Sequence, residues 1–422
     1  MFDVRRSTFI PSPGVPGEGQ GEGTSLPSHS RFSIALSPSP EYPISMIRTL
    51  LLPFVSALFF LTPAFAAADE AFTPLFNGKD LSNWVNVNCA PTTWSVRDGI
   101  IHCTGIPTGL LRTDRMYENY ILELEWKHLK KGGNAGLFVH SAAITARGQP
   151  FSKAIEVQII DANHPKGFAT SHGDVFAIHG ATFVPDRPHP DGWMRCLPSE
   201  HRAKPAGEWN HYRVECRDGK ISLAVNGKVV SGGTKCIPRK GYIVLESEGS
   251  DALFKNIRIH ELPSSNPPAA EVAEADEGYK SLYTGVDLSG WKAESGNEAG
   301  WKPKDWTLTY AGTSDARGHE LSSEKRYRNL SLIVDWQLKG EASEVPITLR
   351  GKTPSAGKAA RSGQWNRALV TVKDDRMTVL VNDQVVMKDE QLADHDGESA
   401  IVLKPAPGIA FANIYVKDLS RP

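Results

Sequence analysis

The chain has 422 residues with 47 basic and 48 acidic side chains, so its formal charge is −1. This balance excludes the strongly basic surface with which proteins bind nucleic acid. Hydrophobic residues make up 40% of the chain and aromatic residues 9%, which is enough for a packed core and excludes wholesale disorder. The length predicts two or three domains. The 37 Gly and 29 Pro favour short strands joined by turns over a helical bundle.

The N-terminal part contains the pattern of a secretory signal peptide at residues 46–68, MIRTLLLPFVSALFFLTPAFAAA. Arg48 supplies the positive charge, an apolar run follows, and small residues predict cleavage near Ala66 to Ala68. The run is short for a membrane anchor and no charged stop follows it. We therefore predict export to the periplasm or the outside, with no stable membrane span. Because signal peptides begin a chain, we expect residues 1–45 to be a miscalled or disordered extension.

Five segments of the chain recur in the same order, which indicates a duplication. The pairs are LFNGKDLSNW and LYTGVDLSGW, YENYILELEW and YRNLSLIVDW, GEWNHYRV and GQWNRALV, LAVNGKVV and VLVNDQVV, and FKNIRIHEL and FANIYVKDL. They predict domains at 70–262 and 279–420, joined by a Pro- and Ala-rich linker at 263–278.

The spacing of the repeats differs between the two copies. Trp126 and Trp336 are 210 positions apart, whereas Trp209 and Trp365 are 156 apart, so the second copy lacks 54 residues. The missing stretch corresponds to roughly residues 145–200. We therefore expect the chemistry of the protein to lie in the first domain.

Both copies consist of short runs rich in β-branched and aromatic residues, bounded by Gly, Asn, Asp or Pro. Asp218-Gly219 and Asn226-Gly227 predict hairpin turns. No helical periodicity is sustained after residue 68. The sequence therefore predicts an all-β protein with two jelly-roll β-sandwich domains in tandem.

Three predicted strands, GLFVH, AIEVQII and YIVLESE, each have one apolar and one polar face. The apolar positions are Leu137, Val139, Ile155, Val157, Ile159, Ile243 and Leu245. The polar positions are His140, Glu156, Gln158, Glu246 and Glu248, which line one surface if the strands are neighbours in one sheet. Ordinary solvated strand faces are the other interpretation. The second copy keeps none of these polar groups, which favours the functional interpretation.

The stretch that the second copy lacks is rich in residues suited to chemistry. SHGDVFAIHGA places His172, Asp174 and His179 close together, and these types serve in proton transfer or metal binding. No HExxH or other tight ligand spacing occurs, so a divalent metal ion stays one interpretation among others. Arg195 is a candidate for binding a polar ligand, and Trp193 for stacking on a sugar ring.

The order FNGKDLSNW, NAGLFVH, EVQIID, GEWNHYRV, LAVNGK, FKNIRI resembles the 3-keto-disaccharide hydrolase domain family. The resemblance covers nearly all of the first domain and, more weakly, a degenerate second copy. It implies a concanavalin-like jelly roll that acts on a carbohydrate, a glycoside oxidised to a ketone at C3. A general base would remove the C2 proton.

The resemblance also guides the choice of site residues. Glu156 matches the family's glutamate in its E-x-Q motif, whereas His140 stands where many members carry Arg, and Glu246 and Glu248 occupy a Q-x-H position. We predict as catalytic residues Glu156, His179 and Asp174. We predict as substrate-binding residues His140, Gln158, His172, Trp193, Arg195, Glu246 and Glu248.

Two other functions fit the sequence. A retaining β-glucanase uses E-x-D-x-x-E on a bulged strand, and Glu156, Gln158 and Asp161 have that spacing with Gln at the centre. A non-catalytic, lectin-like protein that binds carbohydrate is the other. The oligomeric state is left open. Five cysteines cannot all pair within one chain, so we expect structural bridges or buried thiols at Cys89, Cys103, Cys196, Cys216 and Cys236.

Overall fold

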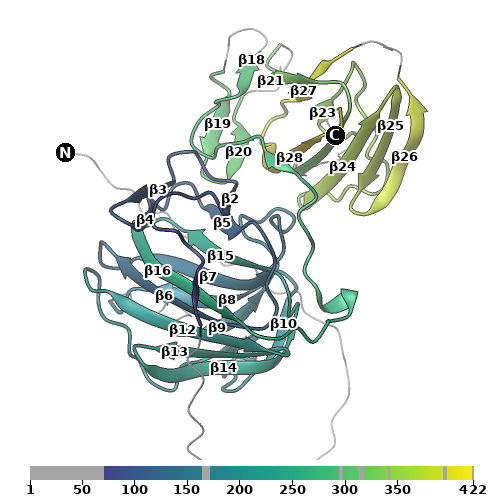
Figure 1. The fold of residues 1–422 in the computed structure, drawn as a ribbon. Coiled ribbons are helices and arrows are strands. Elements are labelled where there is room, and N and C mark those ends of the chain that lie inside the picture. The colour runs from purple at the N-terminus through teal and green to yellow at the C-terminus, as the bar shows by residue number, and fades with distance from the viewer. Residues whose placement is uncertain are drawn as a thin grey trace, which may run out of the picture. The chain divides into compact units, whose positions relative to one another are not determined.

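The computed structural model describes residues 71–163, 172–293, 298–312, 318–340, 343–392 and 397–420. The predicted signal peptide and the 1–45 extension lie outside these ranges. The described strands form four antiparallel sheets, two from residues 73–261 and two from residues 280–418. Figure 1 shows them as two sandwiches, purple to teal and green to yellow. The protein is therefore all-β with two jelly-roll sandwiches in tandem, which confirms the predicted fold class.

The first sandwich contains a nine-stranded and a seven-stranded sheet among the described residues. The nine-stranded sheet has the order β10 (Thr182–Pro185), β14 (Lys228–Ile237), β13 (Lys220–Val225), β12 (Asn210–Arg217), β6 (Tyr120–His128), β16 (Ala252–Glu261), β4 (Ile100–Cys103) and β3 (Trp94–Arg97), with β1 (Thr73–Pro74) paired to β16. The seven-stranded sheet has the order β11 (Arg195–Cys196), β9 (Val175–Ile178), β8 (Ala154–Ile160), β7 (Asn134–Ser141), β15 (Tyr242–Ser247), β5 (Gly109–Thr113) and β2 (Trp84–Val87).

The second sandwich is a smaller version of the first. Its larger sheet has the order β19 (Trp301–Lys304), β20 (Thr307–Tyr310), β28 (Ala410–Asp418), β22 (Leu330–Gln337), β24 (Trp365–Lys373), β25 (Arg376–Val381) and β26 (Gln384–Gln391), with β17 (Lys280–Ser281) paired to β28. Its smaller sheet has the order β18 (Trp291–Ala293), β21 (Leu321–Tyr327), β27 (Ser399–Leu403) and β23 (Ile347–Thr348). These four strands correspond to β2, β5, β15 and β7. Strands β8, β9 and β11 come from the stretch that the second copy lacks.

The predicted hairpin turns form as their residues dictate. Asp218 and Gly219, between β12 and β13, have φ values of 48° and 73°, and Asn226 and Gly227, between β13 and β14, have 47° and 86°. Two successive positive φ values define the type I′ turn, which Asp-Gly and Asn-Gly adopt with little strain. The turns set the register of β12, β13 and β14.

The same side-chain bonds hold the corresponding turn in both sandwiches. The Asn226 side-chain oxygen accepts the His211 N–H at 2.9 Å, and Asn382 accepts the Arg367 N–H at 3.1 Å. The Asn226 amide also donates to Asn210 at 3.0 Å, as the Asn382 amide does to Asn366 at 2.8 Å. A match at this level of detail agrees with the duplication that the sequence indicates.

Apolar side chains fill the space between the two sheets of the first sandwich. Trp126 and Tyr212 meet edge to face with ring centroids 5.3 Å apart. All seven apolar positions predicted from the three alternating strands lie in this core, and none is exposed. Their neighbours along each strand therefore point to the outer face of the seven-stranded sheet, where the polar residues gather.

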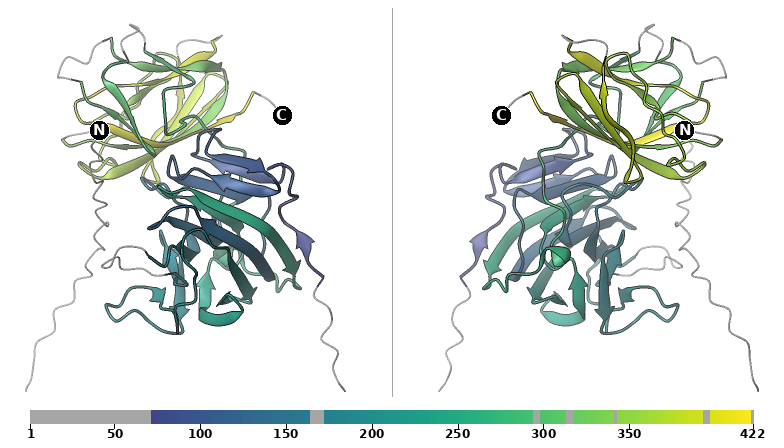
Figure 2. Two further views of the ribbon diagram at one scale, coloured as in Figure 1. Left: turned by 90° about the vertical axis from the view of Figure 1, so that its left-hand side faces the viewer. Right: turned by 90° about the vertical axis from the view of Figure 1, so that its right-hand side faces the viewer.

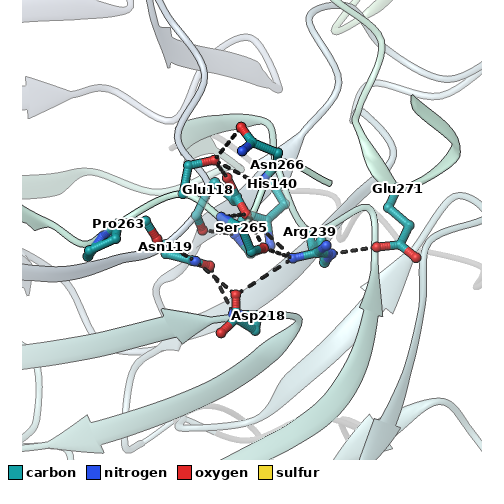
Figure 3. A network of polar contacts seen from close by, with 10 residues as sticks. Glu118, Asn119, His140, Asp218, Arg239, Pro263, Ser265, Asn266 and Glu271 are labelled. Atoms are coloured by element: carbon teal, nitrogen blue, oxygen red, sulfur yellow. Dashed lines mark hydrogen bonds and ion pairs between the residues drawn. The ribbon is translucent and has the colours of Figure 1, made fainter. Parts of the chain in front are cut away.

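The linker is fixed to the first sandwich by a buried glutamate, Glu118 (Figure 3). Its carboxylate accepts hydrogen bonds from the Ser265 N–H at 3.0 Å and the Ser265 hydroxyl at 2.6 Å. Arg239 pairs with both Glu118 and Glu271. Glu271 belongs to the 3-10 turn η1 (Ala269–Glu271), which Figure 2 shows on the linker.

All five cysteines lie among the described residues, and each is a buried free thiol. The thiol interpretation is therefore confirmed, and no bridge joins these five. In the described part of the chain, no helix is long and apolar enough to cross a membrane.

Candidate active site

Polar side chains meet over one glycine on the outer face of the seven-stranded sheet. In the β7–β8 ladder, Gly136 lies opposite Gln158, and Phe138 opposite Glu156. On the other side of β7, Leu245 of β15 lies opposite Leu137, which places Glu246 beside Gly136. Strands β8, β7 and β15 thus bring Glu156, Gln158 and Glu246 to one place.

Gly136 leaves the space that these carboxylates occupy. A Cβ atom at this position would lie 2.5 Å from Glu246 Oε2 and 3.0 Å from Glu156 Oε1. The two oxygens can therefore be no further apart than these two distances together. Any side chain larger than hydrogen at Gly136 would displace one of the carboxylates.

Asn134, one further step along β7, connects two more of the polar groups. Its amide donates to Glu248 Oε2, and its side-chain oxygen accepts the Gln158 amide at 2.8 Å. We refer to Glu156, Glu246 and Glu248 as the glutamate cluster. Gln158 and Asn134 support the cluster from the side.

Burial changes the protonation of all three glutamates. It raises the pKa of Glu156 well above its ordinary value, with a further contribution from Glu248. It raises the pKa of Glu246 in the same way, and both neighbouring glutamates add to the effect. It raises the pKa of Glu248 to about 7, against the hydrogen bond from Asn134. Glu248 can therefore hold and release a proton near neutral pH, and Glu156 and Glu246 keep their protons to a higher pH than exposed glutamates do.

Two acceptors of the site have no hydrogen-bond partner among the described residues. They are Glu246 Oε2 and Gln158 Oε1, and both are buried. Buried acceptors without a partner are uncommon in folded proteins and call for an explanation. A ligand with hydroxyl groups would supply the missing donors.

A cationic group flanks the cluster on β9 and β11. Phe176 lies opposite Glu156 in one ladder and opposite Arg195 in the next. The Arg195 guanidinium sits over the Phe176 ring, 3.7 Å from its centroid, and pairs with buried Asp174 at 2.8 Å. Its positive charge acts against burial and favours the carboxylate form of Glu156.

Aromatic rings form the other flank. Phe151 meets Phe138 edge to face with centroids 5.8 Å apart, and the His179 ring lies 6.5 Å from Phe151. Burial lowers the pKa of His179 to about 4. His179 is therefore a neutral imidazole at neutral pH.

The sheet does not bring all the predicted residues together. The expectation that His140 shares the polar face is wrong: His140 has a φ of 54°, β7 and β15 change register beside it, and its ring turns inward to Tyr120. Its Nε2 donates to the Glu118 carbonyl at 3.1 Å. Arg350, its counterpart in the second sandwich, has a φ of 48°, so this kink belongs to the fold.

His172 and Trp193 lie apart from the glutamate contacts described above. The His172 ring packs against His201, with centroids 4.8 Å apart. Trp193 is 45% exposed and stacks flat on His189 at 4.4 Å, two residues before Arg195. An exposed flat ring at this place can hold the face of a sugar.

Asn134, Gly136 and Phe138 were missed as site residues. The signal was present, because NAGLFVH places all three on the same face by simple alternation. The ion pair between Asp174 and Arg195 could not be predicted, because the sequence does not show that β9 and β11 are paired.

The geometry required for a retaining β-glucanase is not formed by Glu156 and Asp161. Strand β8 pairs with β7 and β9 without a bulge. Asp161 instead accepts the N–H groups of Gly132 and Ala206 at 2.7 and 2.8 Å. Among the described residues, no group of three or more His, Cys, Asp and Glu side chains is arranged to hold a metal ion.

Residues 71–260 match the family model described as the 3-keto-alpha-glucoside-1,2-lyase-like domain. The chain contains a domain of this family. A curated relative, the 3-keto-disaccharide hydrolase of Bacteroides thetaiotaomicron, is 22% identical over 242 residues, covering 45% of this chain and 78% of the relative. The family and this relative indicate a carbohydrate-active protein of the glycosyl hydrolase kind.

The chain is also similar to solved structures. A candidate glycosyl hydrolase from Parabacteroides distasonis is 25% identical, with a TM-score of 0.37, over 46% of this chain and 95% of that one. The β-glucanase of Bacillus licheniformis is 13% identical, with a TM-score of 0.30, over 47% of this chain and 100% of that one.

Proposed function

We propose that the first sandwich hydrolyses glycosides that already carry a ketone at C3, with Glu156 as the general base. The observation that supports this most is the convergence of two buried glutamates, Glu156 and Glu246, over Gly136, with Arg195 acting on the charge of Glu156. Two carboxyl groups in different surroundings can take opposite roles, one as base and one as acid. Arg195 favours the anionic form of Glu156, whereas Glu246 has two glutamate neighbours that favour its protonated form.

The reaction proceeds by elimination and addition. The C3 ketone acidifies the C2 proton, which Glu156 removes, and the electron pair forms an enolate. The C1–O bond then breaks, and the leaving alcohol takes a proton from Glu246. Water adds to C1 of the resulting enone and a proton returns to C2, so the products are a 3-keto sugar and an alcohol.

The remaining residues bind and orient the substrate in this proposal. Arg195, held by Asp174, stabilises the negative charge on the enolate oxygen. Gln158 accepts a sugar hydroxyl with its unpartnered oxygen. Trp193 stacks on a sugar ring at the edge of the sheet. Asp174 thus acts through Arg195, and neutral His179 contributes a hydrogen bond.

Glu156→Gln tests the proposal, with Glu208→Gln, an exposed substitution, as control. The wild-type protein should release the alcohol from a 3-keto-glucoside and exchange the C2 proton with solvent deuterium. Loss of the base should slow both by about 100-fold or more. Binding of sugars without turnover of any 3-keto-glycoside would contradict the enzyme and support the lectin-like alternative.

We also propose that the protein is exported, on the strength of the signal-peptide pattern at residues 46–68. N-terminal sequencing of the mature protein should begin near residues 67–69. A mature chain that retains Met46 would overturn export by this route.

A further inference from the structure

The loop between β7 and β8, residues 142–153, forms part of the wall of the glutamate cluster. Its residue Phe151 packs edge to face on Phe138, which lies opposite Glu156 in the ladder. The Phe138 ring in turn comes within 3.0 Å of the position of a Cβ on Gly136, where the carboxylates meet. The path of the loop therefore decides how closely aromatic rings cover the cluster.

Three polar residues of the second sandwich hold this loop by its backbone. Both sandwiches belong to one compact unit, residues 68–422. Asp335 on β22 accepts the Gly148 N–H at 2.7 Å. Arg367 on β24 donates to the Thr145 carbonyl at 3.0 Å. Asn413 on β28 donates to the carbonyls of Ala146 and Gln149 at 3.0 and 3.1 Å.

These three residues also satisfy one another, so their positions are fixed. Asp335 is fully buried and forms a bidentate pair with Arg367, at 2.7 and 2.8 Å. Asn413 donates to Asp335 at 2.7 Å. A buried ion pair with directed hydrogen bonds holds its partners firmly, because a loosened group would be left without a partner. The loop is thus bound by a rigid set of donors and acceptors.

Gly148 fits this set closely. It has a φ of 61°, and a Cβ on it would lie 2.1 Å from Trp365 Cγ. A methyl group here would push the loop away from the second sandwich. Gly363, in the same sandwich, has a φ of 68° with nothing within 4 Å of its Cβ position, which makes it a matched control.

The first sandwich carries the same pair at the corresponding positions. Asn256 on β16 donates to Glu125 on β6 at 2.6 Å, as Asn413 does to Asp335. That pair is exposed, whereas the pair in the second sandwich is buried under the loop. In the second sandwich, the asparagine–acid pair that both sandwiches share therefore also binds the β7–β8 loop.

We propose that the second sandwich is part of the catalytic unit, with Asp335, Arg367 and Asn413 as positioning residues that hold the β7–β8 loop over the glutamate cluster. The kinetic part of this proposal rests on the proposed function. The structural part, the hold on the loop, does not.

Gly148→Ala in the full chain tests both parts, with Gly363→Ala as control. Hydrogen exchange of residues 142–153 should become at least about tenfold faster in Gly148→Ala only. The value of kcat on a 3-keto-glucoside should fall about tenfold or more. The acid limb of the pH–rate profile should move to lower pH, because water reaches Glu156 and weakens the effect of burial.

A merely destabilised protein would lose activity without moving that limb. Adding Trp365→Gly to Gly148→Ala removes the three atoms nearest the new methyl group, which are Cβ, Cγ and Cδ1 of Trp365, and should restore slow exchange in part. Unchanged exchange, or faster exchange with unchanged kinetics, would overturn the proposal. If the wild-type protein is inactive on 3-keto-glucosides, the proposed function is wrong. The hydrogen-exchange rates of residues 142–153 would then still test whether the second sandwich holds the loop. If Gly148→Ala does not fold, Asn413→Ala takes its place with the same expectations.

Discussion

Replacing Glu248 by Gln is expected to stabilise the folded protein at pH 8 but not at pH 4. Burial raises the pKa of Glu248 from 4.5 to about 7. The folded protein thus binds this proton more tightly than the unfolded chain, so the stabilisation is fully present below about pH 4.5 and is lost as the pH rises to about 7. At ~1.4 kcal/mol for each pH unit, the loss is on the order of 3 kcal/mol.

Glutamine resembles the protonated carboxyl and keeps an acceptor for the Asn134 amide. The free energy of unfolding, measured in urea at both pH values, should therefore be equal to that of the wild type at pH 4 and higher at pH 8. Glu208→Gln, on an exposed side chain, should leave it unchanged at both. An equal gain at pH 4 and pH 8 would refute the role of the buried charge.

Gly136→Ala should lower both stability and activity, because its Cβ would lie 2.5 Å from Glu246 Oε2; we expect a cost of about 1–3 kcal/mol, measured by urea unfolding, and wild-type behaviour would contradict the described packing. The thiols of Cys89, Cys103, Cys216 and Cys236 should not react with a disulfide reagent at pH 8 before unfolding, because burial raises the pKa of each. Fast reaction of the native protein would show that one of them is accessible.

The elements of the fold could be predicted because each depends on local signals. Alternation placed Ile155, Val157 and Ile159 in the core, and Asp218-Gly219 fixed a hairpin. Comparison of the chain with itself located the stretch that forms β8, β9 and β11. These signals lie within a few residues, or within a repeat, and need no knowledge of the tertiary pairing.

The candidate site could be predicted only in part. Glu156, Gln158 and Glu246 come together because regular alternation holds along β8 and the end of β15, and Glu248, just after β15, joins them through Asn134. His140 breaks the alternation, because a residue with positive φ turns its side chain to the other face. A prediction from strict alternation of side chains along a strand does not include such a kink. The hold of Asp335 on Gly148 joins residues 187 positions apart, and no sequence period connects them.

Comparison of the two sandwiches separates the features that both share from the features that only the first has. Both sandwiches have a residue with positive φ at this place, His140 in β7 and Arg350 just after β23, and both have the asparagine–acid pair. Only the first keeps carboxyl groups where Glu246 and Glu248 lie; the second has Lys404, which pairs with Glu344 at the surface, and Ala406. A cluster of buried carboxyl groups lowers stability at neutral pH. The second sandwich shows that the fold can be built without this cluster, which agrees with the proposal that the cluster serves a ligand and not the fold.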